Sequence, residues 1–267
     1  MQIELLALEV LGFIFSLFIG ISLGLAGSGG SILAVPILVY FFGVSSEVAT
    51  THSLFIVGIT SVVASYKHHR AGNLKLKTAL IFTVPSLTVL LLTRRFFLPT
   101  IPEVIFSNNH FTLPRHVLIL IIFSVLMIAS ALSMIRKEST LETGQASILK
   151  IMLIGTLIGF LSGLLGAGGG FLIVPALLFY AGLELKYAIA TSVFIITVNS
   201  LIGFLGDVMA RVHFDKILLT KVSGMALIGM FIGIAISKKI DGKKLKPVFG
   251  WFVLVIAIFI IVKELFL

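Results

Sequence analysis

The chain has 267 residues, of which 58% are hydrophobic and only 12% are charged. Soluble domains carry about 25% charged residues, so a chain this poor in charge must face lipid over most of its surface. The net charge of +9 does not point to nucleic acid, because the basic residues lie in short connectors, where such residues determine membrane topology. The absence of cysteine excludes disulfides and thiolate sites, and we expect no metal and no cofactor.

Apolar segments alternate with short connectors along the chain. The segments at about 5–25 and 148–165 each run into a glycine-rich stretch, which is followed by a short apolar segment at 31–42 or 171–182. A dozen residues at about 1.5 Å each cannot cross a hydrocarbon core of about 30 Å, so we expect half-helices there. Three longer apolar segments follow in each half, at 47–66, 76–98 and 115–135, and then at 186–206, 216–237 and 246–265.

The two halves are copies of one unit. Residues 20–62 align with residues 159–201 at a constant offset and without a gap. Glycines, a proline and serines keep their register, which chance similarity between apolar sequences does not explain. The matched pairs include Gly27/Gly166, Gly30/Gly169, Pro36/Pro175, Ser53/Ser192 and Phe55/Phe194. We therefore predict a first repeat at 1–137, a linker at 138–150 and a second repeat at 151–267.

The basic connectors predict the topology. The segments 67–77, 136–150 and 238–246 are rich in lysine and arginine, so we expect them in the cytoplasm and both termini outside. Each unit then crosses the membrane an odd number of times, which inverts the second copy relative to the first. The predicted fold is an all-α polytopic membrane protein with two inverted-topology repeats, each a glycine-broken helical hairpin and three transmembrane helices. Secondary transporters are built in this way, with a site near the bilayer midplane.

The glycine-rich breaks are the first candidate site. A half-helix that begins just after a break presents unpaired N–H groups and a positive dipole end, which together bind anions. Two inverted breaks are expected to converge on one ligand; the alternative is close helix packing, to which we assign Gly20 and Gly159. Pro36 and Pro175 are expected to kink or end the half-helices. The candidate binding residues are Gly27, Ser28, Gly29, Gly30 and Ser31, and Gly166, Ala167, Gly168, Gly169 and Gly170.

A second polar set follows each hairpin, and its hydroxyl and amide groups are able to donate hydrogen bonds to an oxyanion. Its members are His52, Ser53, Thr191, Ser192 and Asn199. Bonds between helices are the alternative for each hydroxyl. His52 either binds an anion or carries a coupled proton, or it is a neutral histidine bonded to a neighbouring helix. Arg94 is expected to snorkel to the membrane surface, with an anion vestibule as the alternative.

Carboxylates are missing from the middle of the apolar segments. Glu47, Glu184, Asp207 and Asp215 all lie near segment ends. Because cation transporters and proton pumps usually need a carboxylate within the membrane, this pattern disfavours a cation substrate and favours an anion.

The GSGGS and GAGGG breaks, the Val-Pro pair after each and the Ala-x-x-x-Ser-x-Phe stretch beyond them resemble the TauE/SafE family of sulfite-exporter-like permeases. The resemblance covers nearly the whole chain. It implies transport of sulfite or a small organosulfonate, usually outward across a bacterial inner membrane, and transporters of this kind commonly form homodimers. Ser31 stands where the family pattern has its last glycine, and His52 stands opposite Thr191, so the two copies are not equivalent.

Electrical work agrees with export. Moving one monovalent anion out of a cell that is negative inside gains about 2.3 kcal/mol per 100 mV, so export by alternating access needs no coupling ion. Uptake of the same anion needs a coupled proton, for which His52 is the candidate. An anion channel is the other alternative. We do not expect an enzyme, because Ser28, the one serine in a protease-like setting, is matched by Ala167 in the second copy.

Overall fold

A computed structural model describes residues 2–26, 30–108, 111–135, 147–166, 169–212, 214–237 and 242–266. Within these ranges, seven helices are long and apolar enough to cross a membrane, which confirms a polytopic membrane protein. The first half contains α1 (Gln2–Ala26), α2 (Ser31–Phe42), α3 (Ser46–Arg70), α4 (Leu76–Leu92) and α6 (Arg115–Ile135). The second half contains α7 (Ile148–Leu165), α8 (Gly170–Tyr180), α9 (Leu185–Met209), α10 (Lys216–Ser237) and α11 (Gly242–Phe266).

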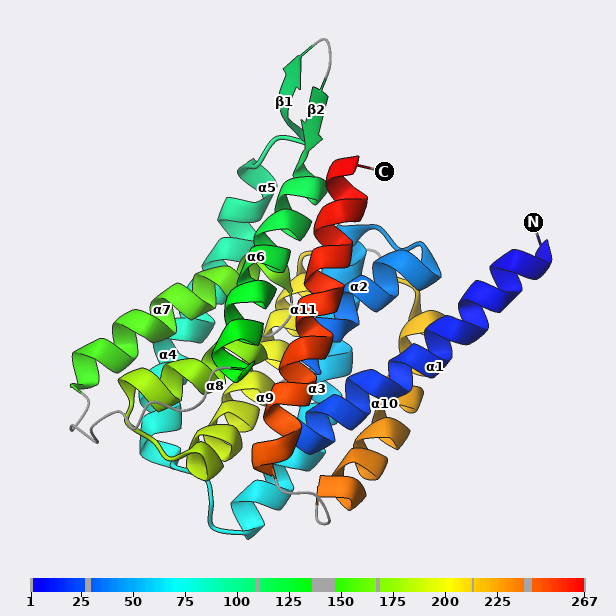
Figure 1. The fold of residues 1–267 in the computed structure, drawn as a ribbon. Coiled ribbons are helices and arrows are strands. Elements are labelled where there is room, and N and C mark those ends of the chain that lie inside the picture. The colour runs from blue at the N-terminus through cyan, green and yellow to red at the C-terminus, as the bar shows by residue number, and fades with distance from the viewer. Residues whose placement is uncertain are drawn as a thin grey trace.

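The connection between α4 and α6 departs from the predicted all-α fold. A π-helix, η1 (Thr93–Phe97), and a short helix, α5 (Leu98–Thr100), lead into an antiparallel pair of strands, β1 (Val104–Asn108) and β2 (Phe111–Pro114). Branched and aromatic side chains in β1 favour extended backbone, which explains the strand. The ribbon projects from one end of the helical bundle, where the C-terminus also lies (Figure 1). We call this the hairpin end.

The two predicted half-helices are present. Helix α2 turns back along α1, because the ring of Phe42 contacts Phe13 at 5.1 Å between centroids and Phe41 contacts Phe15 at 4.8 Å. Each half-helix continues past its proline, since Pro36 lies inside α2 and Pro175 inside α8. The alternative that these prolines end the half-helices is therefore wrong. Both stand at the sixth position of the helix, where more than one helical turn has already formed.

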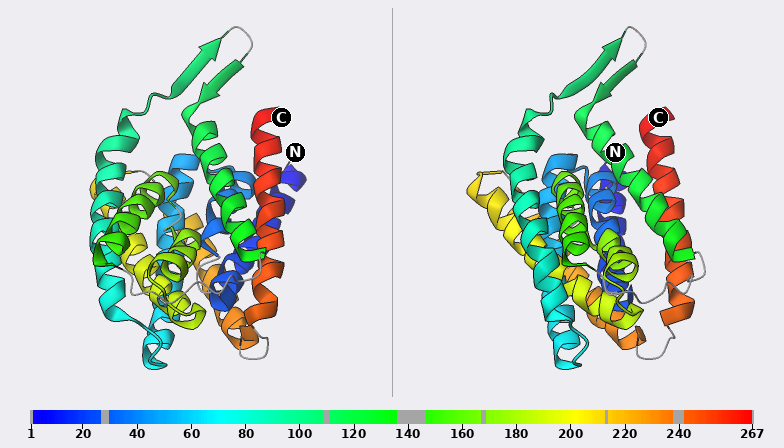
Figure 2. Two further views of the ribbon diagram at one scale, coloured as in Figure 1. Left: turned by 60° about the vertical axis from the view of Figure 1, so that its left-hand side comes forward. Right: turned by 90° about the vertical axis from the view of Figure 1, so that its left-hand side faces the viewer.

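Helices from opposite halves pack against one another in matched pairs. Helix α1 packs on α10 and α4 packs on α7, whereas α3 packs on α9 and α6 on α11. Exchanging equivalent helices of the two halves leaves this set of pairs unchanged (Figures 1 and 2). Glycines make the first two contacts close: a Cβ at Gly20 would overlap the carbonyl oxygen of Ala226, and one at Gly159 would overlap that of Ser86. The assignment of Gly20 and Gly159 to helix packing is thus confirmed.

The α3–α9 pair forms the middle of the bundle and runs antiparallel. Thr51 bonds to Asp207, Phe55 contacts Phe204, and a Cβ on Gly58 would meet Leu201. This register places Thr60 and Asn199, which are equivalent positions in the two copies, at the centre of the pair. Both side chains are fully buried.

Equivalent turns end α3 and α9, which extends the repeat beyond the aligned residues. The amide of Ala71 donates to the carbonyl of Lys67, and the amide of Ala210 donates to that of Gly206. The next residue has a left-handed conformation in both copies: Gly72 has φ 69° and Arg211 has φ 60°. Only glycine adopts this conformation without a steric penalty.

Replacing Arg211 with glycine should therefore stabilise the protein by about 1 kcal/mol. The change removes the Cβ clash and restores the residue type found in the other copy. Thermal unfolding of the purified chain measures the effect. Gly72→Ala is the matched control: its Cβ would meet nothing within 4 Å, so only the conformational penalty should appear, as a loss of similar size. Equal melting temperatures for all three proteins would contradict the assignment of strain to Arg211.

Candidate functional site

A buried ion pair joins four helices at the hairpin end. Nε of Arg94 donates to Oδ1 of Asp207 at 2.7 Å, and Nη2 donates to Oδ2 of the same carboxylate. Nη1 donates to the carbonyl of Gly163 at 3.2 Å. The hydroxyls of Thr50 and Thr51 lie 3.5 and 3.2 Å from Nη2, and Thr51 donates to Asp207 at 2.8 Å. We call these five residues the hairpin-end cluster.

The π-helix η1 places Arg94 in this cluster. A π-turn inserts one extra residue and rotates the side chains that follow it, and such turns are frequent at functional sites. At this point α4 meets the end of α7, because a Cβ on Gly163 would lie 2.8 Å from Cβ of Thr93. The side chains of Arg94 and Asp207 are only 6% and 7% exposed. The prediction that Arg94 snorkels to the surface is therefore wrong.

The described part of the second glycine break lies beside this cluster. Gly166 ends α7 with φ 64°, and its amide donates to the carbonyl of Ser162 at 2.9 Å. A Cβ at Gly166 would overlap Thr50, and one at Gly169, with φ 66°, would overlap the hydroxyl of Ser162. Glycine is needed at both positions, because the backbone is left-handed and because Thr50 or Ser162 leaves no room for a Cβ. Gly170 is buried as the first residue of α8.

The described part of the first break lies at the other end of the bundle. Gly24, near the end of α1, packs on Met230 of α10. Met230 belongs to a small buried cluster with Ala64, toward the end of α3, and Val193, toward the start of α9. Gly30 packs on α1 itself and Ser31 is fully buried. The expected convergence of the two breaks is not found for these residues. The remaining predicted residues of the breaks lie outside the described residues: Gly27, Ser28, Gly29, Ala167 and Gly168.

The second polar set is buried, but its members do not meet at one point. His52 lies at the hairpin end, with its ring edge-on to Phe214 at 6.2 Å. Thr191 lies at the opposite end, where its hydroxyl accepts the amide of Lys75 at 3.2 Å. In the antiparallel register of α3 and α9, His52 and Thr191 are about 15 residues apart along the helix axes. At 1.5 Å per residue this is about 22 Å. Ser53 and Ser192 are also buried. Ser53 follows His52 at the hairpin end, and Ser192 follows Thr191 at the opposite end.

Several buried polar atoms have no hydrogen-bond partner among the described residues. Both ring nitrogens of His52, the hydroxyls of Ser53 and Ser200 and the amide oxygen of Asn199 belong to this group. Buried polar groups are usually satisfied by protein or by ordered water. These atoms are therefore available to a water molecule or a ligand.

The centre of the bundle is polar but uncharged. Nδ2 of Asn199 donates to the hydroxyl of Ser86 on α4 at 2.7 Å, at the point where Ser86 contacts Gly159 of α7. In the other copy, Thr60 instead donates to the carbonyl of Ile56 in its own helix at 2.6 Å. Of the predicted site residues, Asn199 is the one the structure places at the crossing of α3 and α9.

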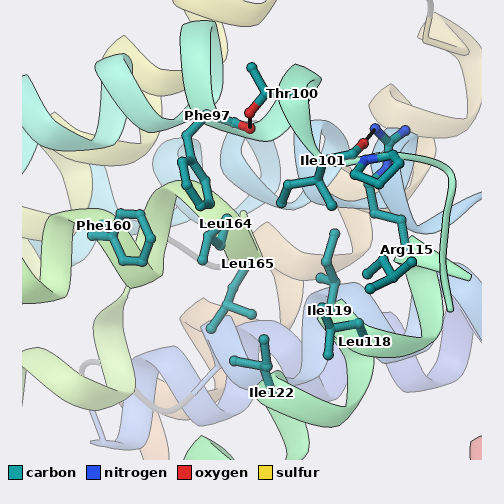
Figure 3. A pocket seen from close by; sticks show the side chains of 12 residues that line it. Phe97, Thr100, Ile101, Arg115, Leu118, Ile119, Ile122, Phe160, Leu164 and Leu165 are labelled. Carbon is teal, nitrogen blue, oxygen red and sulfur yellow. Dashed lines mark hydrogen bonds between the residues drawn. The ribbon is translucent and has the colours of Figure 1, made fainter. Parts of the chain in front are cut away.

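A separate cavity of about 510 Å³ opens between η1, α6 and α7 (Figure 3). Its walls are almost entirely apolar, with Phe97, Ile119 and Phe160 among the lining side chains. Arg115 reaches its rim and donates to the carbonyl of Ile101 at 2.9 Å while pairing with Glu47. None of the predicted site residues lines it, and an apolar wall does not suit a hydrated anion.

The pairing of Arg94 with Asp207 was not predicted from the sequence. Both residues do lie near segment ends, as predicted, but the antiparallel packing of α9 on α3 buries Asp207 there. One signal was available: an arginine and an aspartate each interrupt an apolar segment, and charges inside a membrane protein usually pair with one another. Only the folded arrangement identifies the partners.

Comparisons with known proteins agree with this architecture. The chain matches the sulfite exporter TauE/SafE family over residues 12–260. A probable membrane transporter protein of Methanocaldococcus jannaschii is 27% identical over 92% of both chains, and one of Xylella fastidiosa is 29% identical over 91% of both. A third, from Bacillus subtilis, is 26% identical over 87% of this chain and 91% of the relative. No solved structure matches the chain significantly. The chain therefore belongs to the sulfite exporter TauE/SafE family of membrane transporters.

Proposed function

We propose that the protein exports a sulfur-containing oxyanion, such as sulfite or a small organosulfonate, across a bacterial inner membrane. The observation that carries the proposal is the uncharged polar centre at Asn199 and Ser86, which lies where the two copies cross. Amide and hydroxyl groups bind an oxyanion through hydrogen bonds, whereas a cation needs carboxylates. The family supplies the class of substrate.

Alternating access is supported by the exchange of equivalent helix pairs between the halves. We infer that the copies have inverted topology, with the hairpin end and both termini in the periplasm and the basic connectors in the cytoplasm. In this arrangement Asn199 lies near the midplane. The described parts of the glycine breaks then lie toward the two ends of the path and not at its centre.

The membrane potential supports export without a coupling ion, because expelling a monovalent anion gains about 2.3 kcal/mol per 100 mV. Proton-coupled uptake is the second candidate function. One observation favours it: the fully buried ring of His52 has two nitrogens without a partner among the described residues, and such a ring is able to take up a proton with an anion.

Proteoliposomes with a clamped potential test the proposal. Sulfite and sulfoacetate should leave the vesicles in a saturable manner, and an inside-negative potential should accelerate their efflux. Efflux that ignores the potential and follows a proton gradient would overturn uncoupled export in favour of the second candidate. Flux that does not saturate would overturn alternating access and favour a channel.

Asn199→Leu should reduce this flux at least tenfold, because it removes the donor to Ser86 and fills the polar centre with an apolar side chain. Ser124→Ala is the matched control, since Ser124 is a buried serine on α6 that bonds only within its own helix. Efflux from vesicles with equal amounts of folded protein is the measurement. Equal flux in the two variants would show that the anion does not pass Asn199.

A further inference from the structure

We propose that Arg94 is an oxyanion-binding residue at the hairpin end and that Asp207 is an internal occupant which the anion displaces. The inference rests on the proposed function, because it assumes that a sulfur oxyanion passes through the protein. It adds a second anion-binding position, at Arg94 and outside the polar centre. Asp207 occupies this position when no anion is bound.

The geometry of the pair suits an exchange of anions. Arg94 grips Asp207 with two parallel N–H groups, Nε and Nη2, one on each carboxylate oxygen. A sulfonate or hydrogensulfite group presents a pair of oxygens to the same fork and carries the same single negative charge as the carboxylate it replaces. The third contact, from Nη1 to the carbonyl of Gly163, holds the guanidinium in place while its partner changes.

Stability alone does not account for this pair. Two charges that are more than nine-tenths buried incur a desolvation penalty that often exceeds their mutual attraction, so a buried ion pair is weak support for a fold. Ionisable residues inside a membrane protein mark ion and substrate pathways instead. Asp207 lies two residues before the end of α9, so a short movement of that end releases the carboxylate to water.

The other copy lacks the cluster, although it repeats the fold around it. At the constant offset of the repeat, Thr51 corresponds to Ala190 and Asp207 to His68. Where Gly163 meets Thr93 beside Arg94, the equivalent Gly24 meets Met230, Gly233 and Ile234. A pair that served only to close a symmetrical path would be expected at the equivalent positions of both copies. Ala190 and His68, which the structure describes, hold no such pair, so we infer that the Arg94–Asp207 pair serves a step at the hairpin end.

Further polar groups surround Arg94. The hydroxyls of Thr50 and Thr51 accept from Nη2, and Gly166 of the second break packs directly on Thr50. Thr50 donates its own proton to the carbonyl of Glu47, whereas Thr51 donates to Asp207 and becomes a free donor once the carboxylate leaves. His52, the next residue of α3, has no partner for its ring nitrogens among the described residues. An anion that takes the place of Asp207 therefore meets one fixed positive charge and two neutral donors, the hydroxyl of Thr51 and the ring of His52.

Asp207→Asn tests the proposal, with methanesulfonate as the probe. The amide keeps the shape of the carboxylate but no longer competes as an anion. The variant should therefore bind methanesulfonate at Arg94 at least tenfold more tightly than the unchanged protein does. Without the probe the variant should melt at a lower temperature, because the charge of Arg94 is left unpaired. Methanesulfonate should restore that melting temperature, which a purely structural role of Asp207 does not predict.

Two further variants complete the test on the full chain. Arg94→Lys keeps the charge but loses the fork, and it should weaken binding in the Asp207→Asn background about tenfold. Arg115→Gln removes another arginine at the same end, one that pairs with Glu47, and it should leave binding unchanged. If Asp207→Asn neither tightens binding nor is rescued by methanesulfonate while the unchanged protein still transports sulfite, this inference fails alone. If the unchanged protein transports no sulfur oxyanion, the proposed function fails.

Discussion

Replacing Gly20 with leucine should prevent α1 from packing on α10 and should cost at least about 3 kcal/mol, which is the upper range for overpacking a core. The reason is backbone contact: a Cβ on Gly20 would lie 1.8 Å from the carbonyl oxygen of Ala226 and 2.5 Å from the amide nitrogen of Met230. A flexible side chain would yield, but two helix backbones do not. Yield of monodisperse protein after detergent extraction, followed by thermal unfolding, measures the loss.

Gly224→Ala is the control for this prediction. Gly224 belongs to α10, the helix that Gly20 contacts, and a Cβ on Gly224 would meet nothing within 4 Å. Alanine favours the helical state over glycine by about 1 kcal/mol, so this variant should be as stable as the unchanged protein or more so. Normal yield and stability of Gly20→Leu would contradict the close contact of α1 with α10.

Removing one member of the Arg94–Asp207 pair should be the second most damaging change. Arg94→Met and Asp207→Leu should each lower the free energy of unfolding by about 3–5 kcal/mol, because each leaves a buried charge unpaired. The double variant should lose much less, since it buries no charge. A double-mutant cycle on thermal or denaturant unfolding should therefore give a coupling energy of about 3 kcal/mol or more.

The pair of Arg115 with Glu47 provides the comparison at the same end of the bundle. The side chain of Glu47 is half exposed, at 51%, so water screens the pair and its coupling energy should stay below about 1 kcal/mol. Similar coupling energies for the two pairs would mean that Arg94 and Asp207 are hydrated in the membrane, contrary to their burial.

The helices and the duplication were predictable from the sequence because hydrophobic length and register are local properties. The short segments after the glycines, the paired repeats and the helix-packing role of Gly20 and Gly159 were all predicted from spacing. The β1–β2 hairpin was not predicted, because it lies in the connector between the apolar segments 76–98 and 115–135, for which no secondary structure was predicted. The continuation of α2 and α8 past Pro36 and Pro175 was left open, since a proline near the start of a helix is compatible with either outcome.

The candidate site was less predictable, because it depends on which faces of distant helices meet. Polarity singled out His52, Ser53 and Asn199 as candidate binding residues, and all three are buried. Their separation was not predicted, because spacing along α3 and α9 says nothing about the antiparallel register that places His52 and Thr191 at opposite ends. The partnership of Arg94 with Asp207 joins residues more than one hundred positions apart, and no local pattern encodes it.

The glycine contacts have a consequence for how the molecule moves. Gly20 and Gly24 hold α1 against α10, and Gly159 and Gly163 hold α4 against α7, so each tight pair takes one helix from either half of the chain. The two halves therefore cannot slide past each other as intact blocks. Any rocking motion must instead carry α1 with α10 as one rigid arm and α4 with α7 as the other, hinged about the crossing of α3 and α9. The bodies that move therefore combine helices from both repeats, although each repeat is continuous in the sequence.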